Sequence, residues 1–268
     1  MRSGSGILVP IDFSERAAPA ARSAKSLAAQ FDSPLTLLHA APPLDLADIG
    51  GQMAAGLSHQ HETRLREELD AFLAGELPTP PVTRILTPGD PAAVIVREAH
   101  ERAGLIVMPT HGYGPFRRFI LGSTTAKVLH DADCPVWTGV HLENAPASSV
   151  PLSRVLCAVD LGPQSSKTLC WAAALAIQFG ARLTLMHVCL GAADAARREI
   201  EGLAAFVHAE AEPLLATGDP PATICSAAGR LSADVLVIGR GSAAGVFGRL
   251  RANAYSIIRQ SPCPVVSV

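Results

Sequence analysis

The sequence predicts an α/β protein with two doubly wound domains, each built on a five-stranded parallel sheet. Short apolar runs without polar alternation, such as residues 105–108, are typical of strands that are buried on both faces of a parallel sheet. These runs alternate with helical segments along the chain, and the whole pattern occurs twice. Because connections between parallel strands are right-handed, each half is expected to wind helices over both faces of its sheet.

In the first half, strands and helices alternate. The first apolar run ends at Asp12, and Asp12 or Ser14 can cap the helix that follows. Pro109 ends the fourth run, and Ser123 stands near the N-cap of the last helix. We expect strands at residues 6–11, 35–39, 82–87, 104–108 and 135–140, and helices at residues 14–31, 57–77, 90–103 and 123–131.

The second half repeats the motifs of the first in the same order. GILVPIDFS matches RVLCAVDLG, which aligns Asp12 with Asp160, and PLTLLHA matches RLTLMHV, which aligns His39 with His187; both pairs are offset by 148 residues. The later Gly-Asp-Pro and Cys-Pro-Val motifs are offset by 129 residues, so the second copy has lost about 19 residues. The missing part corresponds to a Pro/Gly-rich loop of the first copy.

The repeat sets the domain organisation. The polar, proline-bearing segment 141–151 is typical of a linker. We therefore expect one domain at residues 1–140 and a second at residues 152–268. The expected strands of the second domain are residues 153–159, 182–188, 212–217, 234–238 and 264–268.

Composition excludes several classes of function. The net charge of -2 comes from interspersed signs, which leaves no basic face for nucleic acid. The longest apolar runs are under ten residues, so no membrane span is expected. The beginning MRSGSGILVPID lacks the pattern of a signal peptide, and a cytoplasmic location is the expectation. The six cysteines form no CxxC pair and are expected to be reduced core residues, without metal or redox chemistry.

The segment from Pro109 to Thr124 has the features of a phosphate-binding loop. It follows a buried strand, contains Gly112 and Gly122, and leads into a helix at Ser123. Backbone amides at a helix N-terminus have no intrahelical partner and favour an anion. The structural alternative is that Gly122 serves a tight turn and Ser123 only caps the helix.

Gly112, nine residues and then Gly122-Ser123 resemble the ATP-binding signature of the universal stress protein family, G-x2-G-x9-G-[S/T], with Pro109 in place of the first glycine. ILVPIDFSE, LLHA, GDPAAVIVREA and the Cys-Pro-Val strand also resemble this family. The chain is identified as a tandem member with two Rossmann-like domains of the adenine nucleotide alpha hydrolase-like type. The resemblance implies ATP, or ADP or AMP, with or without Mg, at the carboxyl ends of the strands.

The resemblance also implies which residues contact the nucleotide. Asp12 is expected to bind ribose or the adenine amine or to help hold a metal, with helix capping as its alternative. Ala40 and Met108 would form apolar walls for the base, unless they are plain core. His111 could contact phosphate or ribose, and Arg118 could contact phosphate; a structural loop histidine and a solvated arginine are the alternatives. The full implied set is Pro10, Asp12, Ala40, Met108, Pro109, His111, Gly112, Arg118, Gly122, Ser123 and Thr124.

Pro109 reduces the number of main-chain donors at this site. Proline has no N–H, so a bond from that amide is lost, at a cost of about 0.5–1.5 kcal/mol. In the second copy Gly239 aligns with Pro109, but Arg251 and Ala252 replace Gly122 and Ser123. We therefore expect no nucleotide in the second domain.

Three classes of function follow from these patterns. We favour a regulatory protein that binds an adenine nucleotide in its N-terminal domain, and the alternative is a nucleotide-free protein-interaction module with both sites degenerate. The sequence has no GxxxxGK[ST] loop, no GxSxG elbow and no metal triad, so slow ATP hydrolysis is the most that we expect of it as an enzyme. The resemblance implies association through the strand near the C-terminus of each domain, so the two Cys-Pro-Val strands are expected to pair within the chain as a pseudo-dimer. A further homodimer and protein partners are left open.

Overall fold

The computed structural model describes residues 6–42, 51–77, 81–110, 121–139, 152–189, 193–240 and 248–268. The elements of the first half are β1 (Gly6–Pro10), α1 (Ala17–Phe31), β2 (Leu35–Ala41), α2 (Gly51–Ala71), β3 (Thr83–Pro88), α3 (Pro91–Arg102), β4 (Ala103–Val107), α4 (Ser123–Asp131) and β5 (Val136–Thr138). Those of the second half are β6 (Arg154–Ala158), α5 (Ser165–Phe179), β7 (Arg182–Cys189), α6 (Ala193–Phe206), β8 (Glu212–Thr217), α7 (Pro220–Arg230), β9 (Val235–Ile238), α8 (Gly248–Gln260) and β10 (Val265–Ser267).

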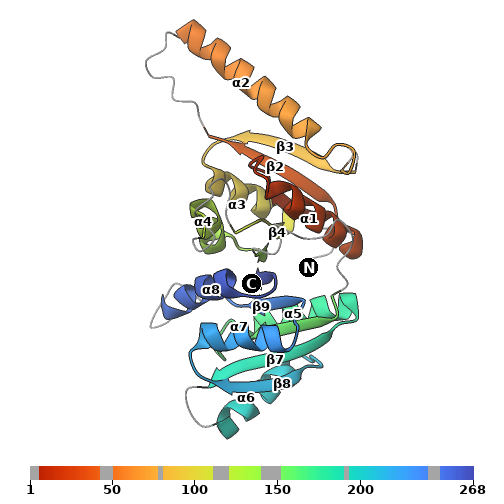
Figure 1. The fold of residues 1–268 in the computed structure, drawn as a ribbon, viewed down its shortest axis with the longest axis vertical. Coiled ribbons are helices and arrows are strands. Elements are labelled where there is room, and N and C mark those ends of the chain that lie inside the picture. The colour runs from red at the N-terminus through yellow and green to blue at the C-terminus, as the bar shows by residue number, and fades with distance from the viewer. Residues whose placement is uncertain are drawn as a thin grey trace.

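All ten strands belong to one sheet with the order β3-β2-β1-β4-β5-β10-β9-β6-β7-β8 (Figure 1). Within each half the strands are parallel, and the order of the second half mirrors that of the first. The predicted α/β class with two doubly wound five-stranded units is therefore confirmed. In each half the direction of winding reverses beside the first strand, between β1 and β4 and between β6 and β9, and such a switch point is where open α/β sheets bind ligands.

The two halves meet through their last strands. β5 and β10 run antiparallel, with Val265 opposite Thr138 and Ser267 opposite Val136, and every other strand pair in the described sheet is parallel. This confirms the predicted pairing of the two Cys-Pro-Val strands. A second contact joins the ends of α1 and α5, where the Gln30 and Gln178 side chains each donate to the other's carbonyl at 3.2 and 2.7 Å.

Apolar side chains cover both faces of this sheet continuously across the joint. On one face Ile7 and Val9 of β1 share a buried cluster with Val155 and Cys157 of β6. On the other face Leu8 belongs to a second cluster that also contains residues of both halves. Because successive strand residues point to opposite faces and both faces are covered, the strands are apolar without alternation, as the sequence indicates.

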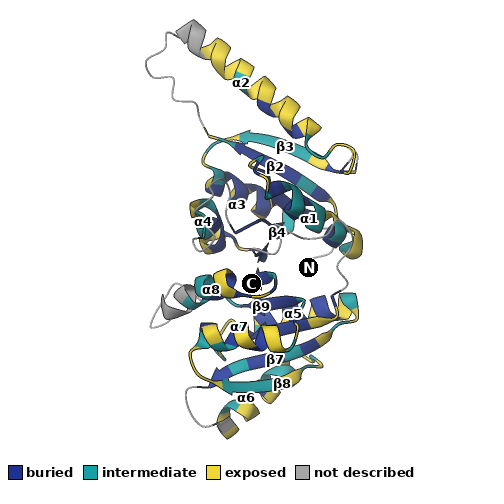
Figure 2. Cartoon of the chain, viewed as in Figure 1, coloured by how far each residue is buried: buried dark blue, intermediate teal, exposed yellow. Residues whose placement is uncertain are grey.

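Helix α2 is the least covered helix of the first half. It begins and ends about six residues earlier than the predicted 57–77, and its described side chains are mostly exposed (Figure 2). Leu65 and Leu69 are its buried side chains. The Arg84 guanidinium of β3 donates to the carbonyl of Leu69 in the last turn of α2 and to those of Phe72 and Leu77 in the segment that follows, at 2.7–3.0 Å.

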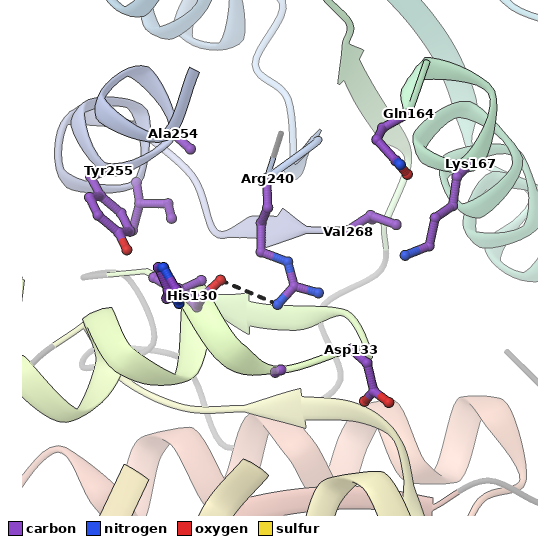
Figure 3. A pocket seen from close by; sticks show the side chains of 11 residues that line it. His130, Asp133, Gln164, Lys167, Arg240, Ala254, Tyr255 and Val268 are labelled. Atoms are coloured by element: carbon purple, nitrogen blue, oxygen red, sulfur yellow. Dashed lines mark hydrogen bonds between the residues drawn. The ribbon is translucent and has the colours of Figure 1, made fainter. Parts of the chain in front are cut away.

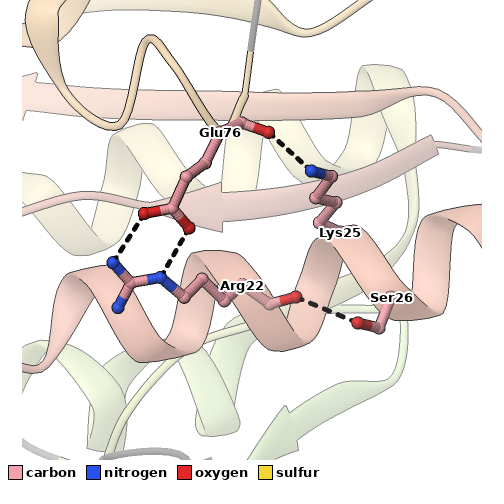
Figure 4. Close-up of polar contacts among 4 residues, drawn as sticks. All are labelled: Arg22, Lys25, Ser26 and Glu76. Carbon is pink, nitrogen blue, oxygen red and sulfur yellow. Dashed lines mark hydrogen bonds and ion pairs between the residues drawn. The ribbon is translucent and has the colours of Figure 1, made fainter. Parts of the chain in front are cut away.

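The connection from α2 to β3 is tied to α1 by charged groups (Figure 4). Arg22 forms a two-bond ion pair with the Glu76 carboxylate at 2.7 and 2.8 Å, and Lys25 donates to the Glu76 carbonyl at 2.6 Å. Hydrogen bonding to Arg22 lowers the pKa of Glu76 below its ordinary value. The contact fixes where the chain enters β3.

Most cysteines are buried, as the sequence predicts. Cys134, Cys157, Cys189 and Cys263 are buried and free, whereas Cys170 is exposed on α5. Burial raises the pKa of Cys134 and Cys263 to about 11, which makes a reactive thiolate unfavourable at neutral pH. No helix in the described part of the chain combines the length and apolarity that a membrane span requires.

Candidate functional site

Five segments of the first half converge on one cavity. They are the carboxyl ends of β1, β2 and β4 and the first turns of α3 and α4, and the cavity has a volume of about 280 Å³. It lies at the switch point, where the chain leaves β1 and β4 in opposite directions. Its walls are formed by Pro10, Ile11, Asp12, Leu38, His39, Ala40, Pro91, Ile95, Met108, Pro109, Gly122, Ser123, Thr124 and Thr125.

Asp12 holds a tight turn after β1 and faces the cavity. Its Oδ1 accepts hydrogen bonds from the Ser14 amide at 3.0 Å and the Ser14 hydroxyl at 2.6 Å. The expected capping role is wrong in detail, because α1 begins at Ala17 and its N-cap residue is Arg16, which makes no side-chain cap. Between them Phe13 has a φ of 57°, a conformation that costs a non-glycine residue free energy. The turn thus presents an exposed carboxylate at the cavity.

His39 also lines the cavity, although the sequence used it only to mark the repeat. Its Nδ1 lies 2.7 Å from the Ile11 carbonyl, and because a carbonyl only accepts, Nδ1 carries the hydrogen. In the neutral ring Nε2 is then an acceptor. The ring packs on Phe13 with 4.5 Å between centroids, so the strained turn and the second strand support each other. The signal in the sequence was a histidine at the carboxyl end of the second strand in both halves.

The apolar part of the wall comes from buried side chains. Ala40 and Met108 are buried, as expected, and Ile95 of α3 joins them. The Met108 amide donates to the Trp137 carbonyl at 3.0 Å, which fixes the chain just before Pro109. The Thr125 hydroxyl donates to the Pro109 carbonyl at 3.3 Å, so α4 is bonded to the chain just after β4. Ala40, Ile95 and Met108 thus form an apolar part of the cavity wall.

The opposite wall is the N-terminus of α4. Ser123 is the first residue of the helix, near the N-cap as expected; the N-cap residue is Gly122, and glycine offers no side chain to cap the helix. The first intrahelical bond runs from the Ala126 amide to the Gly122 carbonyl at 2.8 Å. Within the described residues the amides of Ser123, Thr124 and Thr125 therefore have no hydrogen-bond partner, and the first turn contains no acidic side chain. Three donors and the positive end of the helix dipole thus border the cavity.

The structure brings eight of the predicted site residues together in this wall. They are Pro10, Asp12, Ala40, Met108, Pro109, Gly122, Ser123 and Thr124. His111, Gly112 and Arg118 lie outside the described residues. Sequence reasoning did not find Ile11, Leu38, His39, Pro91, Ile95 and Thr125, which are apolar or structural in type and show their position only in the fold.

The second half differs at the corresponding place. Asp160 and His187 repeat the first-half contacts, with Asp160 accepting from the Gly162 amide and His187 Nδ1 lying 2.9 Å from the Val159 carbonyl. Helix α8, however, begins at Gly248, whereas the residue that aligns with Ser123, the start of α4, is Ala252. The second half therefore has one additional helical turn before the aligned position at which helix α4 of the first half begins.

A family model described as the universal stress protein family matches residues 6–138 and 151–212, well over half of the chain. The chain belongs to the universal stress protein family. A universal stress protein of Mycolicibacterium smegmatis is 30% identical over 195 residues, 70% of this chain and 65% of that protein, slightly less than two thirds of its length. A universal stress protein of Thermus aquaticus is 33% identical over 131 residues, which cover 48% of this chain and 94% of that protein.

The fold of this universal stress protein also resembles solved structures along nearly its whole length. The crystal structure of a universal stress protein from Archaeoglobus fulgidus matches 98% of this chain and 95% of its own, with a TM-score of 0.72 and 22% identity. At this identity the likeness concerns the fold alone. The tandem arrangement of two family domains is thus shown by the sequence match and by the fold together.

Proposed function

We propose that the N-terminal half of this universal stress protein binds ATP, or ADP or AMP, and that the protein acts as a nucleotide-dependent regulator in the cytoplasmic stress response. The observation that carries the proposal is the uncapped N-terminus of α4 at the switch-point cavity. Three free amides in a row suit a phosphate group, since they donate without losing any hydrogen bond within the protein. The proposal rests on this chain's own geometry and on its family.

The remaining walls suit the other parts of an adenine nucleotide. The apolar surface of Ala40 and Met108 matches the face of a purine ring. Asp12 presents a carboxylate in the wall of the same cavity, and it can accept hydrogen bonds from ribose hydroxyls. Asp12 is also the one acidic residue in the described cavity wall, and with the phosphates it could hold Mg.

The first test is to identify what the purified protein carries. The protein is purified without added nucleotide and denatured, and the released small molecules are separated and identified by mass. We expect an adenine nucleotide at about one molecule per chain, since the second half lacks the open helix N-terminus. Calorimetric titration with ATP, in the presence and in the absence of magnesium, then measures affinity and the contribution of the metal.

The second candidate function is a nucleotide-free protein-interaction module. Pro109 favours it, because this residue lies in the cavity wall and supplies no amide to a ligand. An empty extract together with no heat of binding at about 1 mM ATP would support this function instead.

A further inference from the structure

A second cavity lies between the two halves, and it shares no residue with the switch-point cavity. Its volume is about 270 Å³. The end of α4 contributes one wall, and the start of α5, the second residue after β9, α8 and the last residue of the described chain contribute the others (Figure 3). It exists because the antiparallel pairing of β5 and β10 brings the end of α4 opposite elements of the second half. Its walls are formed by Leu129, His130, Ala132, Asp133, Gln164, Lys167, Arg240, Ala254, Tyr255, Ile258 and Val268.

The guanidinium of Arg240 is enclosed in this cavity without a carboxylate partner. It donates to the Cys134 carbonyl at 2.7 Å and to the Leu129 carbonyl at 3.4 Å. Within the described residues Arg240 forms no ion pair within contact distance, although the charge of Asp133 in the same wall acts on it; the Asp133 carboxylate is itself bonded to His100 at 2.6 Å. Burial is the larger effect and lowers the pKa of Arg240 from its ordinary value, but an arginine stays charged at neutral pH. The charge of this enclosed cation is only partly compensated by Asp133, and an anion in the cavity would add to that compensation.

A second cation, Lys167, lines the same cavity. Figure 3 shows the Lys167 ammonium and the Gln164 amide directed towards the space beside Arg240. Lys167 has no ion-pair partner among the described residues, and it stands in the first turn of α5, which contains no acidic residue and whose N-cap Gln164 makes no side-chain cap. The positive end of the α5 dipole adds to the two charges. His130 and Tyr255 complete the polar lining, and they are bonded to Asp131 and to the Ala126 carbonyl.

We propose that this cavity binds a small molecule through an oxyanion group, a phosphate or a carboxylate, held between Arg240 and Lys167. Two bonds to carbonyls use two of the five N–H groups of Arg240, so three remain for the ligand. The guanidinium fork fits either oxyanion in a two-bond geometry. The cavity is larger than an inorganic anion requires, and Ile258, Ala254 and Leu129 offer apolar contact to a small organic body. Because both halves supply walls, such a ligand stabilises the joint between them.

The test is a titration of the full chain followed at Arg240 itself. The probes are inorganic phosphate, phenyl phosphate and benzoate, each added at constant ionic strength, and the readout is the Nε–H signal of Arg240 in a nitrogen-15 NMR spectrum. Gly122→Arg is included in every sample, so that phosphate binding at α4 does not contribute. We expect a saturable shift, and comparison of phenyl phosphate with benzoate identifies the preferred oxyanion. The absence of a saturable shift with all three probes at about 20 mM overturns the proposal.

Variants at Lys167 separate binding from a structural role of Arg240. Arg240 braces α4, so its removal could unfold the joint, whereas Lys167 is exposed and its replacement leaves the fold intact. Lys167→Gln should weaken the probe by about fivefold or more, and Lys167→Arg should retain affinity within about twofold. An affinity that is the same in Lys167→Gln as in the parent overturns the two-cation site.

Discussion

The two halves of this universal stress protein share their strand order, the turn after the first strand and the contact of the second-strand histidine with a carbonyl, yet they differ at the start of the last helix. Helix α4 begins at Ser123 behind an uncapped glycine, while α8 begins one turn earlier relative to the aligned sequences. The strand order, the turn and the histidine contact occur in both halves, so we regard them as part of the fold. The uncapped start of the last helix occurs in the first half, and we connect it with ligand binding.

A second difference between the halves concerns Pro109 and Gly239, which are aligned. A Cβ added to Gly239 would lie 3.1 Å from the Thr168 hydroxyl, so a side chain there is crowded. Ala20 stands in the first half where Thr168 stands in the second, and it has no hydroxyl. The contact that would crowd a side chain at Gly239 therefore has no counterpart from Ala20 in the first half.

The largest effect is expected from Gly122→Arg, which copies Arg251 into the first half. The N-cap glycine has a φ of -61° and a ψ of 145°, which any residue adopts, so folding should be retained. A long side chain at the N-terminus of α4 occupies the phosphate position and should lower ATP affinity by about a hundredfold. Calorimetry measures the affinity and a thermal melt measures stability.

The control for this variant is Gly122→Ala, which adds only a Cβ to the same residue. It should bind ATP more tightly than Gly122→Arg at equal stability. Equal ATP affinity in the wild type and in Gly122→Arg would show that the phosphate does not lie at α4.

The two histidines allow a matched comparison of structural and ligand roles. His39→Ala and His187→Ala each remove a hydrogen bond to a main-chain carbonyl. His39 is 9% exposed and should lose about 2 kcal/mol of unfolding free energy, while the half-buried His187 should lose about 1 kcal/mol. Only His39→Ala should also weaken nucleotide binding, because only His39 lines the switch-point cavity. Chemical denaturation and calorimetry measure the two effects, and an equal loss of affinity in both variants would refute a local role.

Pro109→Gly should strengthen nucleotide binding, by a smaller factor than that by which Gly122→Arg weakens it. A restored amide adds one neutral hydrogen bond, which corresponds to about a two- to tenfold gain in affinity. The same change should lower stability by about 0.5–1 kcal/mol, because glycine increases the entropy of the unfolded chain. Affinity and stability measured on one preparation distinguish the two effects. Weaker binding in Pro109→Gly would show that the proline ring itself contacts the ligand.

The sequence predicted the strands and their two-fold repetition because a parallel strand buried on both faces must be an apolar run. Through the family resemblance, it also predicted the pairing of β5 with β10 and eight residues that line the cavity. It placed Ser123 near the start of α4 but did not single out Gly122 as the N-cap residue, because that position depends on a dihedral angle. It could not predict the cavity at Arg240, because Leu129, Lys167 and Arg240 are far apart in the chain and meet only through the joint of the two halves.

The smallest expected effect concerns the ion pair of Arg22 with Glu76, which only the first half contains. Cys170 and Ala173 stand in α5 where Arg22 and Lys25 stand in α1, so the second half has no counterpart of this contact. Because the pair lowers the pKa of Glu76 from 4.5, ionisation favours the folded state. The contribution of the ion pair to the free energy of unfolding is complete above pH 4.5, the ordinary pKa of the carboxyl group. It is lost as the pH falls through the lower pKa that Glu76 has in the folded protein.

Glu76→Gln should therefore reduce the thermal midpoint slightly at pH 7, and the curves of the two proteins should converge as the pH falls below 4.5. Glu212→Gln is the matched control, since Glu212 is an exposed carboxylate of the outer strand β8 that has no ion pair among the described residues. Midpoints measured from pH 3 to pH 7 at low and at high salt test the assignment, because salt screens an exposed pair. A difference between wild type and Glu76→Gln that persists at pH 3 would mean that the Glu76 side chain acts through packing, and that the two halves differ here in shape more than in charge.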